Sequence, residues 1–366
     1  MGVKYTRRTA LAALGVWQAA SPLLQGQETR WPRSAGEPPG RIAPLDEVLN
    51  TFEIEAMAER RLSSTAFAAI AGGDRNAFDH LIFRPRRFVN AEEVDLTTTL
   101  FGDTMYTPIL VGPASEQQRF HPEGELATVR GASAVNTSVV ISDRSSHPIE
   151  KIAGEAKVSI WYQIFPQVDM APVLNNVQRA AKAGCKVIIL SVGAIRNPGA
   201  SSTASGTSSL ALNGNPHPTW TLVEQVRQAA KLPVVLKGIM SPDEAKVAAG
   251  KGVDGVIVSN YGAPFTEGVA APMELLPSIV DAVGGKIPVL IDGSFRRGSD
   301  VVKALAYGAR GVLVVRPALW GLAAYGSDGV QTAIQMIQSE TARTMGLCGK
   351  PKLAMLDRTM VRYSKH

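Results

Sequence analysis

The segment Ile287–Pro317, with the sequence IPVLIDGSFRRGSDVVKALAYGARGVLVVRP, decides the fold. It contains two short apolar runs, each ending in a polar residue, with a helical pattern between them. The first run ends in Asp292-Gly293-Ser294 and the second ends in Arg316-Pro317. In a (β/α)₈ barrel the loops after the last two strands commonly bind phosphate, because backbone N–H groups and a helix N-terminus face the anion. The segment therefore predicts a strand–helix–strand unit with an anion site at its strand ends.

The chain before this segment repeats the same unit. Continuous apolar strands that alternate with helices are typical of a parallel sheet with both faces covered. The predicted strands are Pro108–Gly112, Ser138–Ile141, Val158–Ile164, Val187–Val192, Pro233–Leu236, Gly255–Val258, Val289–Ile291 and Val312–Val315. The predicted helices include Glu125–Val135, Ala171–Ala183, Leu222–Ala230, Pro242–Ala249 and Gly298–Tyr307.

The number of these units points to a closed barrel. Eight strand runs favour closure over an open doubly wound sheet, and no glycine-rich dinucleotide fingerprint follows the first strand. A helical pattern over Leu45–Gly73 precedes the first strand, and the glycine pair Gly72-Gly73 is a plausible end for it. We therefore predict an α/β fold, a single TIM (β/α)₈ barrel with an N-terminal helical extension.

The N-terminus resembles an export signal. Lys4, Arg7 and Arg8 precede an apolar run over Ala10–Ala20, and no acidic residue occurs before position 28. Thr6-Arg7-Arg8 is similar to a twin-arginine leader, and an ordinary secretory signal or a membrane anchor is the alternative. The run is too short and too interrupted for a stable membrane span. We expect a periplasmic or otherwise exported protein.

The predicted domain boundaries follow from these shifts in composition. Residues 1–27 form the leader, residues 28–44 form a linker rich in Pro and Gly, and residues 45–366 form the barrel domain. Inside the barrel, Pro198–Pro218 is a long irregular insert rich in Ser, Gly and Asn. An insert of this length is expected to act as a flap over the mouth of the barrel.

Composition excludes several classes of function. The formal charge of +6 includes three basic residues of the leader, so the remainder carries 35 basic and 32 acidic residues, as an ordinary enzyme surface does. No basic stripe of a nucleic-acid-binding protein is present in the sequence. Cys185 and Cys348 are too few for a disulfide framework, and no sequence pattern indicates a metal site.

Small or hydrogen-bonding residues follow the predicted strands, where barrel enzymes carry their active sites. In strand order they are Pro113-Ala114-Ser115, Ser142, Gln163, Ser191, Lys237, Ser259, Asp292 and Arg316. Serine and glutamine can satisfy the polar edges of a flat ring system, and arginines can hold a phosphate bidentately. A lysine at the end of a buried strand is costly unless it serves an anion.

These residues lie in motifs that resemble the FMN-dependent α-hydroxy-acid dehydrogenase and oxidase family. The motifs are LIFRPR (Leu81–Arg86), HPEGE (His121–Glu125), LPVVLKGI (Leu232–Ile239), VSNYGA (Val258–Ala263), IDGSFRRGSDVVKALAYGA (Ile291–Ala309) and VVRP (Val314–Pro317). The resemblance implies FMN contacts at Pro113, Ala114, Ser142, Gln163, Ser191, Lys237, Ser259, Asp292, Gly293, Arg296 and Arg316. It also implies that Lys237 lies beside the flavin, and it allows a homotetramer.

The substrate side departs from the family pattern. The family's catalytic histidine and substrate-binding arginine are replaced by Tyr261 and Pro264. Three further family residues, two tyrosines and an aspartate, are replaced by Phe165, Ala69 and Gly193. A tyrosine is a poor base near neutral pH, because its ordinary pKa is about 10. The sequence is therefore identified as a divergent member with a retained flavin shell and an altered substrate shell.

The remaining catalytic candidates are Lys237, Tyr261 and Arg196, which stands at a family arginine position. Arg144 either contacts an anion or is a solvated loop charge paired with Asp143. We expect an FMN-dependent oxidoreductase that acts on CH–OH or a related donor in an altered small-molecule substrate, either a non-carboxylate or a bulkier one, with oxygen or a carrier as electron acceptor. The alternatives are a non-catalytic flavin-binding protein and an FMN-barrel isomerase.

Overall fold

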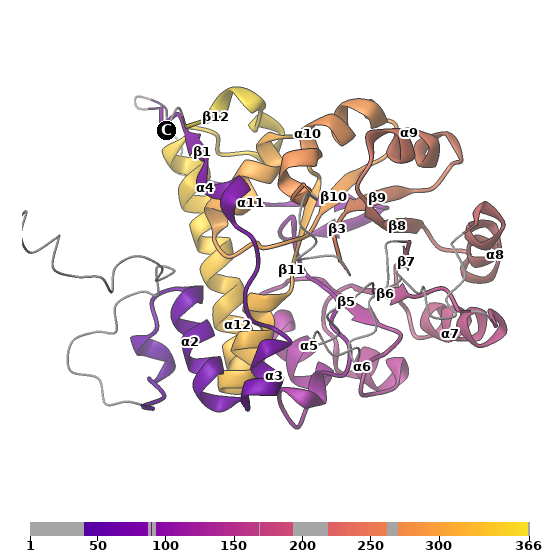
Figure 1. The fold of residues 1–366 in the computed structure, drawn as a ribbon, viewed down its shortest axis with the longest axis horizontal. Coiled ribbons are helices and arrows are strands. Elements are labelled where there is room, and N and C mark those ends of the chain that lie inside the picture. The colour runs from indigo at the N-terminus through magenta and orange to yellow at the C-terminus, as the bar shows by residue number, and fades with distance from the viewer. Residues whose placement is uncertain are drawn as a thin grey trace, which may run out of the picture. The chain divides into compact units, whose positions relative to one another are not determined.

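The computed structural model describes residues 40–86, 89, 93–167, 169–192, 219–261 and 270–364. Within them, eight parallel strands close into a barrel in the order β10-β11-β4-β5-β6-β7-β8-β9. They are β4 (Ile109–Val111), β5 (Val139–Ser142), β6 (Ile160–Ile164), β7 (Val187–Ser191), β8 (Val234–Ile239), β9 (Gly255–Val258), β10 (Val289–Ile291) and β11 (Gly311–Val314). The predicted α/β fold, a TIM barrel, is confirmed (Figure 1).

The barrel interior is apolar at its amino end and polar at its carboxyl end. Each barrel strand contributes at least one side chain to a separate inner core, among them Leu110, Trp161 and Ile257. A hairpin of β2 (Thr98–Leu100) and β3 (Asp103–Met105) contributes Leu100 and Met105 to this core. Such a packed interior leaves the opposite, carboxyl end of the barrel for the functional side chains.

Helices cover the outside of the barrel and bury the second face of each strand. They are α5 (Glu125–Ala134), α6 (Ile149–Glu155), α7 (Ala171–Lys182), α8 (Trp220–Ala230), α9 (Pro242–Gly250), α10 (Pro272–Val283), α11 (Gly298–Ala306) and α12 (Arg316–Leu347). Helices α6, α10 and α12 were not specified from the sequence. Helix α12 spans a break at Gly326, where φ is 64°.

The predicted helical segment Leu45–Gly73 is wrong in detail, because it is divided. It forms a 3₁₀ turn (Leu45–Glu47), α2 (Thr51–Arg61) and α3 (Ser64–Ala68). Asn50 and Ser63 each accept backbone N–H groups of the helix that follows, so each starts a new helix. Helix α2 packs along α12, which places the N-terminal extension beside the last helix of the barrel (Figure 1).

Two short elements complete the domain. Helix α4 (Asn76–Asp79) leads into β1 (Leu81–Phe83), which pairs antiparallel with β12 (Val361–Tyr363). The predicted leader 1–27, residues 28–39 of the linker and the predicted flap Pro198–Pro218 lie outside the described residues, so these remain predictions. Among the described helices, none is both long and apolar enough to cross a membrane.

Candidate active site

Polar side chains form a ring at the carboxyl ends of the barrel strands. Strand register places Ser142 beside Gln163, and Ser191 beside Lys237. These side chains lie one layer above the inner apolar core, because residues two apart on a strand face the same side. All of the polar residues of this ring are buried: Ser142, Gln163, Ser191, Lys237, Ser259 and Asp292. The structure thus brings together residues that the sequence placed at six strand ends.

Lys237 is the charged centre of this ring. Its Nζ lies 2.6 Å from Oδ2 of Asp292 and donates a hydrogen bond of 2.9 Å to Oγ of Ser259. On the next strands, Gln163 Nε2 donates to Ser191 Oγ at 2.7 Å. Buried charges are retained in this way only when they are paired and hydrogen-bonded. The cluster therefore offers a cation, a carboxylate and hydroxyl groups to a polar ligand at the mouth.

Two arginines that follow the last two barrel strands, β10 and β11, converge on one acceptor. Arg296 and Arg316 donate to the same acceptor, the carbonyl oxygen of Gly72, at 2.8 and 2.6 Å. The Arg296 guanidinium also donates to the carbonyl of its neighbour Phe295 and lies over the Trp320 ring, and the negative charge of Glu55 acts on both arginines. Burial, and then the positive charge of Arg316, lower the pKa of Arg296 to about 9. Two guanidinium groups that share one neutral acceptor form a site for an anion.

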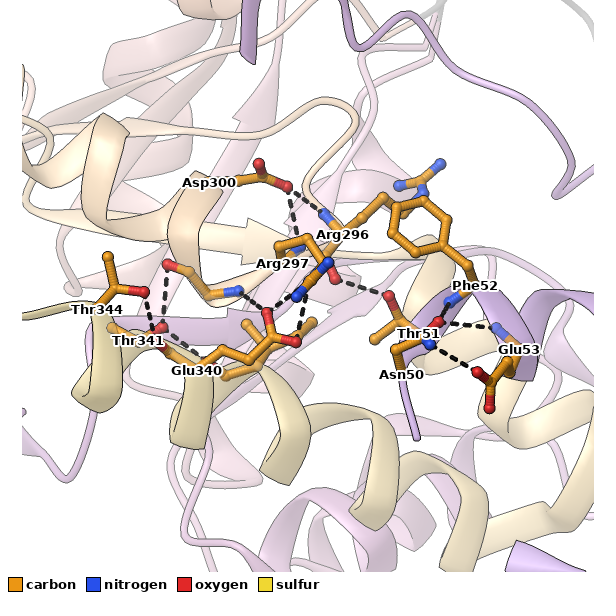
Figure 2. A network of polar contacts seen from close by, with 12 residues as sticks. Asn50, Thr51, Phe52, Glu53, Arg296, Arg297, Asp300, Glu340, Thr341 and Thr344 are labelled. Carbon is orange, nitrogen blue, oxygen red and sulfur yellow. Dashed lines mark hydrogen bonds and ion pairs between the residues drawn. The ribbon is translucent and has the colours of Figure 1, made fainter. Parts of the chain in front are cut away.

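The loop that carries Arg296 is held rigidly by carboxylates, as Figure 2 shows. Asp300 Oδ2 accepts the backbone N–H groups of Arg296 and Arg297, both at 2.9 Å. Glu340 accepts the N–H of Gly298 at 2.9 Å and also pairs with the side chain of Arg297. The expectation that the N-terminus of α11 faces the anion is therefore wrong for these three N–H groups, because protein carboxylates already occupy them.

The glycine turn at Gly72-Gly73 closes around the arginines. A Cβ at Gly73 would lie 1.9 Å from Nη1 of Arg316 and 2.8 Å from Oγ of Ser294. Ser294 has a φ of 59°, a left-handed conformation that favours glycine. The Gly72 carbonyl was not predicted to be a partner of the arginines, although the glycine pair itself is visible in the sequence.

The donors and acceptors of this region fit flavin mononucleotide. Arg296 and Arg316 supply positive charge for the phosphate, and the absence of a side chain at Gly73 makes room for the guanidinium of Arg316. Lys237, Gln163 and the ring serines suit the polar edge of the flavin. Pro113 and Ala114 follow β4, and the Ala114 carbonyl accepts from Gln117 at 3.4 Å. Arg196 lies outside the described residues, and its role stays a prediction.

The substrate side of the mouth carries an aromatic and cationic cluster. The ring of Tyr261 lies 5.1 Å from Nζ of Lys237, and its centroid lies 6.1 Å from that of Phe165. The guanidinium carbon of Arg144 lies 4.4 Å from the Phe165 centroid. Desolvation raises the pKa of the Tyr261 hydroxyl, and the positive charge of Arg144 opposes that rise. Tyr261 is therefore a hydrogen-bond donor near neutral pH.

Asp143 positions this cluster and was not foreseen as a functional residue. Its Oδ2 accepts the backbone N–H of Phe165 at 3.2 Å, which ties the end of β5 to the end of β6. Its Oδ1 is buried without a hydrogen-bond partner. Burial raises the pKa of Asp143 to about 6. No direct ion pair joins it to Arg144 within the described chain, but the positive charge of Arg144 lowers the pKa of Asp143 against the effect of burial, so both interpretations of Arg144 remain predictions. The acidic residue directly after a buried strand was the available signal.

Comparison with known proteins decides the family. The model of the FMN-dependent dehydrogenase family matches residues 58–198 and 193–363. A peroxisomal (S)-2-hydroxyacid oxidase of Arabidopsis thaliana is 33% identical over 353 residues, which cover 87% of this chain and 97% of the relative. An L-lactate oxidase of Nostoc is 35% identical over 359 residues, covering 86% and 98%.

The chain belongs to the FMN-dependent α-hydroxy-acid oxidase family. A crystal structure of mandelate oxidase, 32% identical, superposes with a TM-score of 0.78 and covers 87% of this chain and 100% of its own. The predicted family and FMN as its cofactor are confirmed. The individual contacts to FMN remain predictions that the ring and the two arginines support.

Proposed function

We propose that this member of the hydroxy-acid oxidase family is an FMN-dependent oxidoreductase that oxidises the CH–OH group of a small hydroxy acid. The observation that carries the proposal is the buried cluster of Lys237, Asp292 and Ser259 beside two arginines that share one neutral acceptor. The relatives are named as oxidases of 2-hydroxy acids and L-lactate, which supports this donor class and oxygen as acceptor.

The chemistry balances with one cofactor and one acceptor. Conversion of CH–OH to C=O removes two electrons and two protons from the donor. FMN, held by Lys237, the ring serines and the two arginines, would supply an acceptor for both electrons and one of these protons, with oxygen or a carrier as the final electron acceptor. The protein positions the reactants. The ammonium of Lys237 would stabilise negative charge that develops on the polar edge of the flavin.

The second proton leaves from the donor hydroxyl. Tyr261 replaces the family histidine, and because its pKa is raised it holds its own proton near neutral pH. We therefore expect the hydroxyl proton to pass to solvent rather than to Tyr261. Loss of a general base typically lowers the rate about 10²- to 10⁴-fold, so flavin reduction should be slow and should accelerate with rising pH.

Flavin binding is tested by comparing FMN with riboflavin, which has the same ring system but no phosphate. Arg316→Gln should weaken FMN binding about 10- to 100-fold and leave riboflavin binding nearly unchanged, since only FMN carries the phosphate. Fluorescence titration of the apoprotein measures both affinities. Arg310→Gln, at an exposed position, is the control. Equal losses for FMN and riboflavin would contradict a phosphate role for Arg316.

Turnover is tested by anaerobic reduction of the FMN-loaded protein. A panel of 2-hydroxy acids that includes lactate, glycolate and mandelate should bleach the flavin absorbance, and oxygen should restore it. The raised pKa of Tyr261 favours a second candidate, a flavin-binding protein without turnover. In that case dithionite bleaches the flavin but no hydroxy acid or alcohol does. An isomerase would instead convert its substrate with no net change in flavin absorbance.

We also propose that residues 1–27 direct export and that the chain assembles as a homotetramer. The basic cluster followed by a short apolar run supports the first proposal. N-terminal sequencing of the mature protein from the exported fraction tests it, and Arg7→Lys with Arg8→Lys should retain the protein inside if the route is twin-arginine. Light scattering of the FMN-loaded protein measures the assembly.

A further inference from the structure

The loop after β5 holds an arginine whose charge the described structure leaves without a carboxylate partner. The Arg144 backbone is fixed at both ends: its N–H donates to Oγ of Ser142 at 3.1 Å, and its carbonyl accepts from the N–H of Glu116 at 3.0 Å. Its side chain is half-buried and lies over the Phe165 ring. An arginine whose backbone is fixed and whose guanidinium has no carboxylate partner is well placed to bind an anion.

The position of Arg144 in the barrel places its guanidinium at the mouth, at the carboxyl ends of the strands. In the closed order of strands, β5 and β9 are diametrically opposite. Tyr261, which follows β9, nevertheless lies near Phe165, which follows β6, and Phe165 carries the Arg144 guanidinium. Side chains from opposite sides of the barrel therefore meet above Lys237, at the end of the barrel where enzymes of this architecture bind substrate.

We infer that Arg144 binds the carboxylate of the substrate, in place of the family arginine that Pro264 has replaced in this sequence. The substrate is a 2-hydroxy carboxylate whose carboxylate pairs with Arg144 and accepts a hydrogen bond from the hydroxyl of Tyr261. Its hydroxyl-bearing carbon then lies toward Lys237 and the flavin site. The inference rests on the proposed function and moves the anion-binding residue from one side of the barrel to the other.

The other groups around Arg144 are consistent with this role. Asp143 forms no ion pair with Arg144 in the described chain: its Oδ2 accepts the N–H of Phe165, and its Oδ1 is buried without a hydrogen-bond partner. The positive charge of Arg144 lowers the pKa of both Asp143 and Tyr261 against the opposite effect of burial. Asp143 therefore positions Phe165 beneath the guanidinium and leaves the face of Arg144 toward Tyr261 open to a ligand.

The test compares an anionic and a neutral ligand of the same shape on the FMN-loaded protein. Phenylacetate and phenylacetamide are titrated, and the change in flavin absorbance gives each dissociation constant. Arg144→Gln should weaken phenylacetate about 10- to 100-fold and change phenylacetamide less than about threefold. Arg144→Lys should recover part of the loss, because it keeps the charge without the planar fork. Arg119→Gln, which removes an exposed arginine paired with Glu116, should match the unmodified protein.

Each remaining outcome overturns the inference. These outcomes are unchanged phenylacetate binding in Arg144→Gln, equal weakening of the acid and the amide, or no phenylacetate binding by the unmodified protein. Anaerobic reduction separates the inference from the proposed function. If hydroxy acids bleach the flavin but Arg144→Gln binds phenylacetate normally, the inference alone fails. If phenylacetate binding depends on Arg144 but no hydroxy acid bleaches the flavin, the proposed function alone fails.

Discussion

The flavin side and the substrate side of the barrel mouth are built by different means. On the flavin side, Lys237 and Asp292 are buried, paired with each other and placed by strand register. On the substrate side, Arg144, Phe165 and Tyr261 follow the strands and touch through ring and cation contacts. Strands fix their side chains by pleat and pairing, whereas loops tolerate substitution. The difference supports the prediction that the flavin site keeps the family pattern while the substrate site departs from it.

The largest expected effect tests how strongly the flavin side depends on its buried pair. Lys237→Met leaves Asp292 buried without its cation and should lower the free energy of unfolding of the apoprotein by about 3–5 kcal/mol. Urea unfolding measures the change, and Lys246→Met at an exposed helix position is the control. The double variant Lys237→Met with Asp292→Leu should regain much of the loss. A loss below about 1 kcal/mol in the single variant would show that the pair is not structurally important.

A pH series sharpens the comparison on the substrate side. The pKa of Asp143 is raised to about 6 from an ordinary value of 3.8. Its stabilising contribution is therefore complete below pH 3.8 and is lost as pH rises through 6. Relative to Asp143→Asn, the unmodified protein should lose about 2–3 kcal/mol of unfolding free energy between pH 4 and pH 7, at 1.36 kcal/mol per pKa unit. Parallel curves for the two proteins would rule out the raised pKa.

Restoring the family base tests whether the substrate side limits the rate. Tyr261→His should raise the rate of anaerobic flavin reduction by hydroxy acids about 10- to 100-fold near pH 7, because histidine accepts a proton there and tyrosine does not. The rate gain should stay below the full contribution of a general base, because Gly193 is predicted to replace the aspartate that lies beside the family histidine. Tyr261→Phe is the matched control, and a rate in Tyr261→His no higher than in this control would refute the prediction.

The smallest expected effect probes strain on the flavin side. Ser294 holds a φ of 59°, so Ser294→Gly should raise the unfolding free energy of the apoprotein by about 0.5–1 kcal/mol. Ser145→Gly, in the loop after β5 and without a positive φ, should not be stabilising. Thermal unfolding of the two variants measures the difference. Destabilisation by Ser294→Gly would mean that the contacts of the serine hydroxyl outweigh the backbone strain.

Much of the barrel could be predicted from the sequence, because each strand is a short apolar run. Gly255–Val258 and Val289–Ile291 were predicted with the bounds that the structure has. The division of the N-terminal extension was missed, because helical spacing continues across the capping residues Asn50 and Ser63. Helix α12 was not predicted, because Arg316-Pro317 was interpreted only as the end of a strand, whereas it is also the first turn of the helix.

The sequence by itself determined the barrel and the ring of polar strand ends, and it predicts that Tyr261 and Pro264 replace the family histidine and arginine. These properties follow from local periodicity and from residue type at the end of each strand. Only the tertiary structure decided that Gly72 meets Arg296 and Arg316, which lie 224 and 244 residues away. It alone brought Arg144 toward Tyr261 from the opposite side of the barrel. Closure of the sheet creates such contacts, and no local pattern in the chain records which strands will face each other across the mouth.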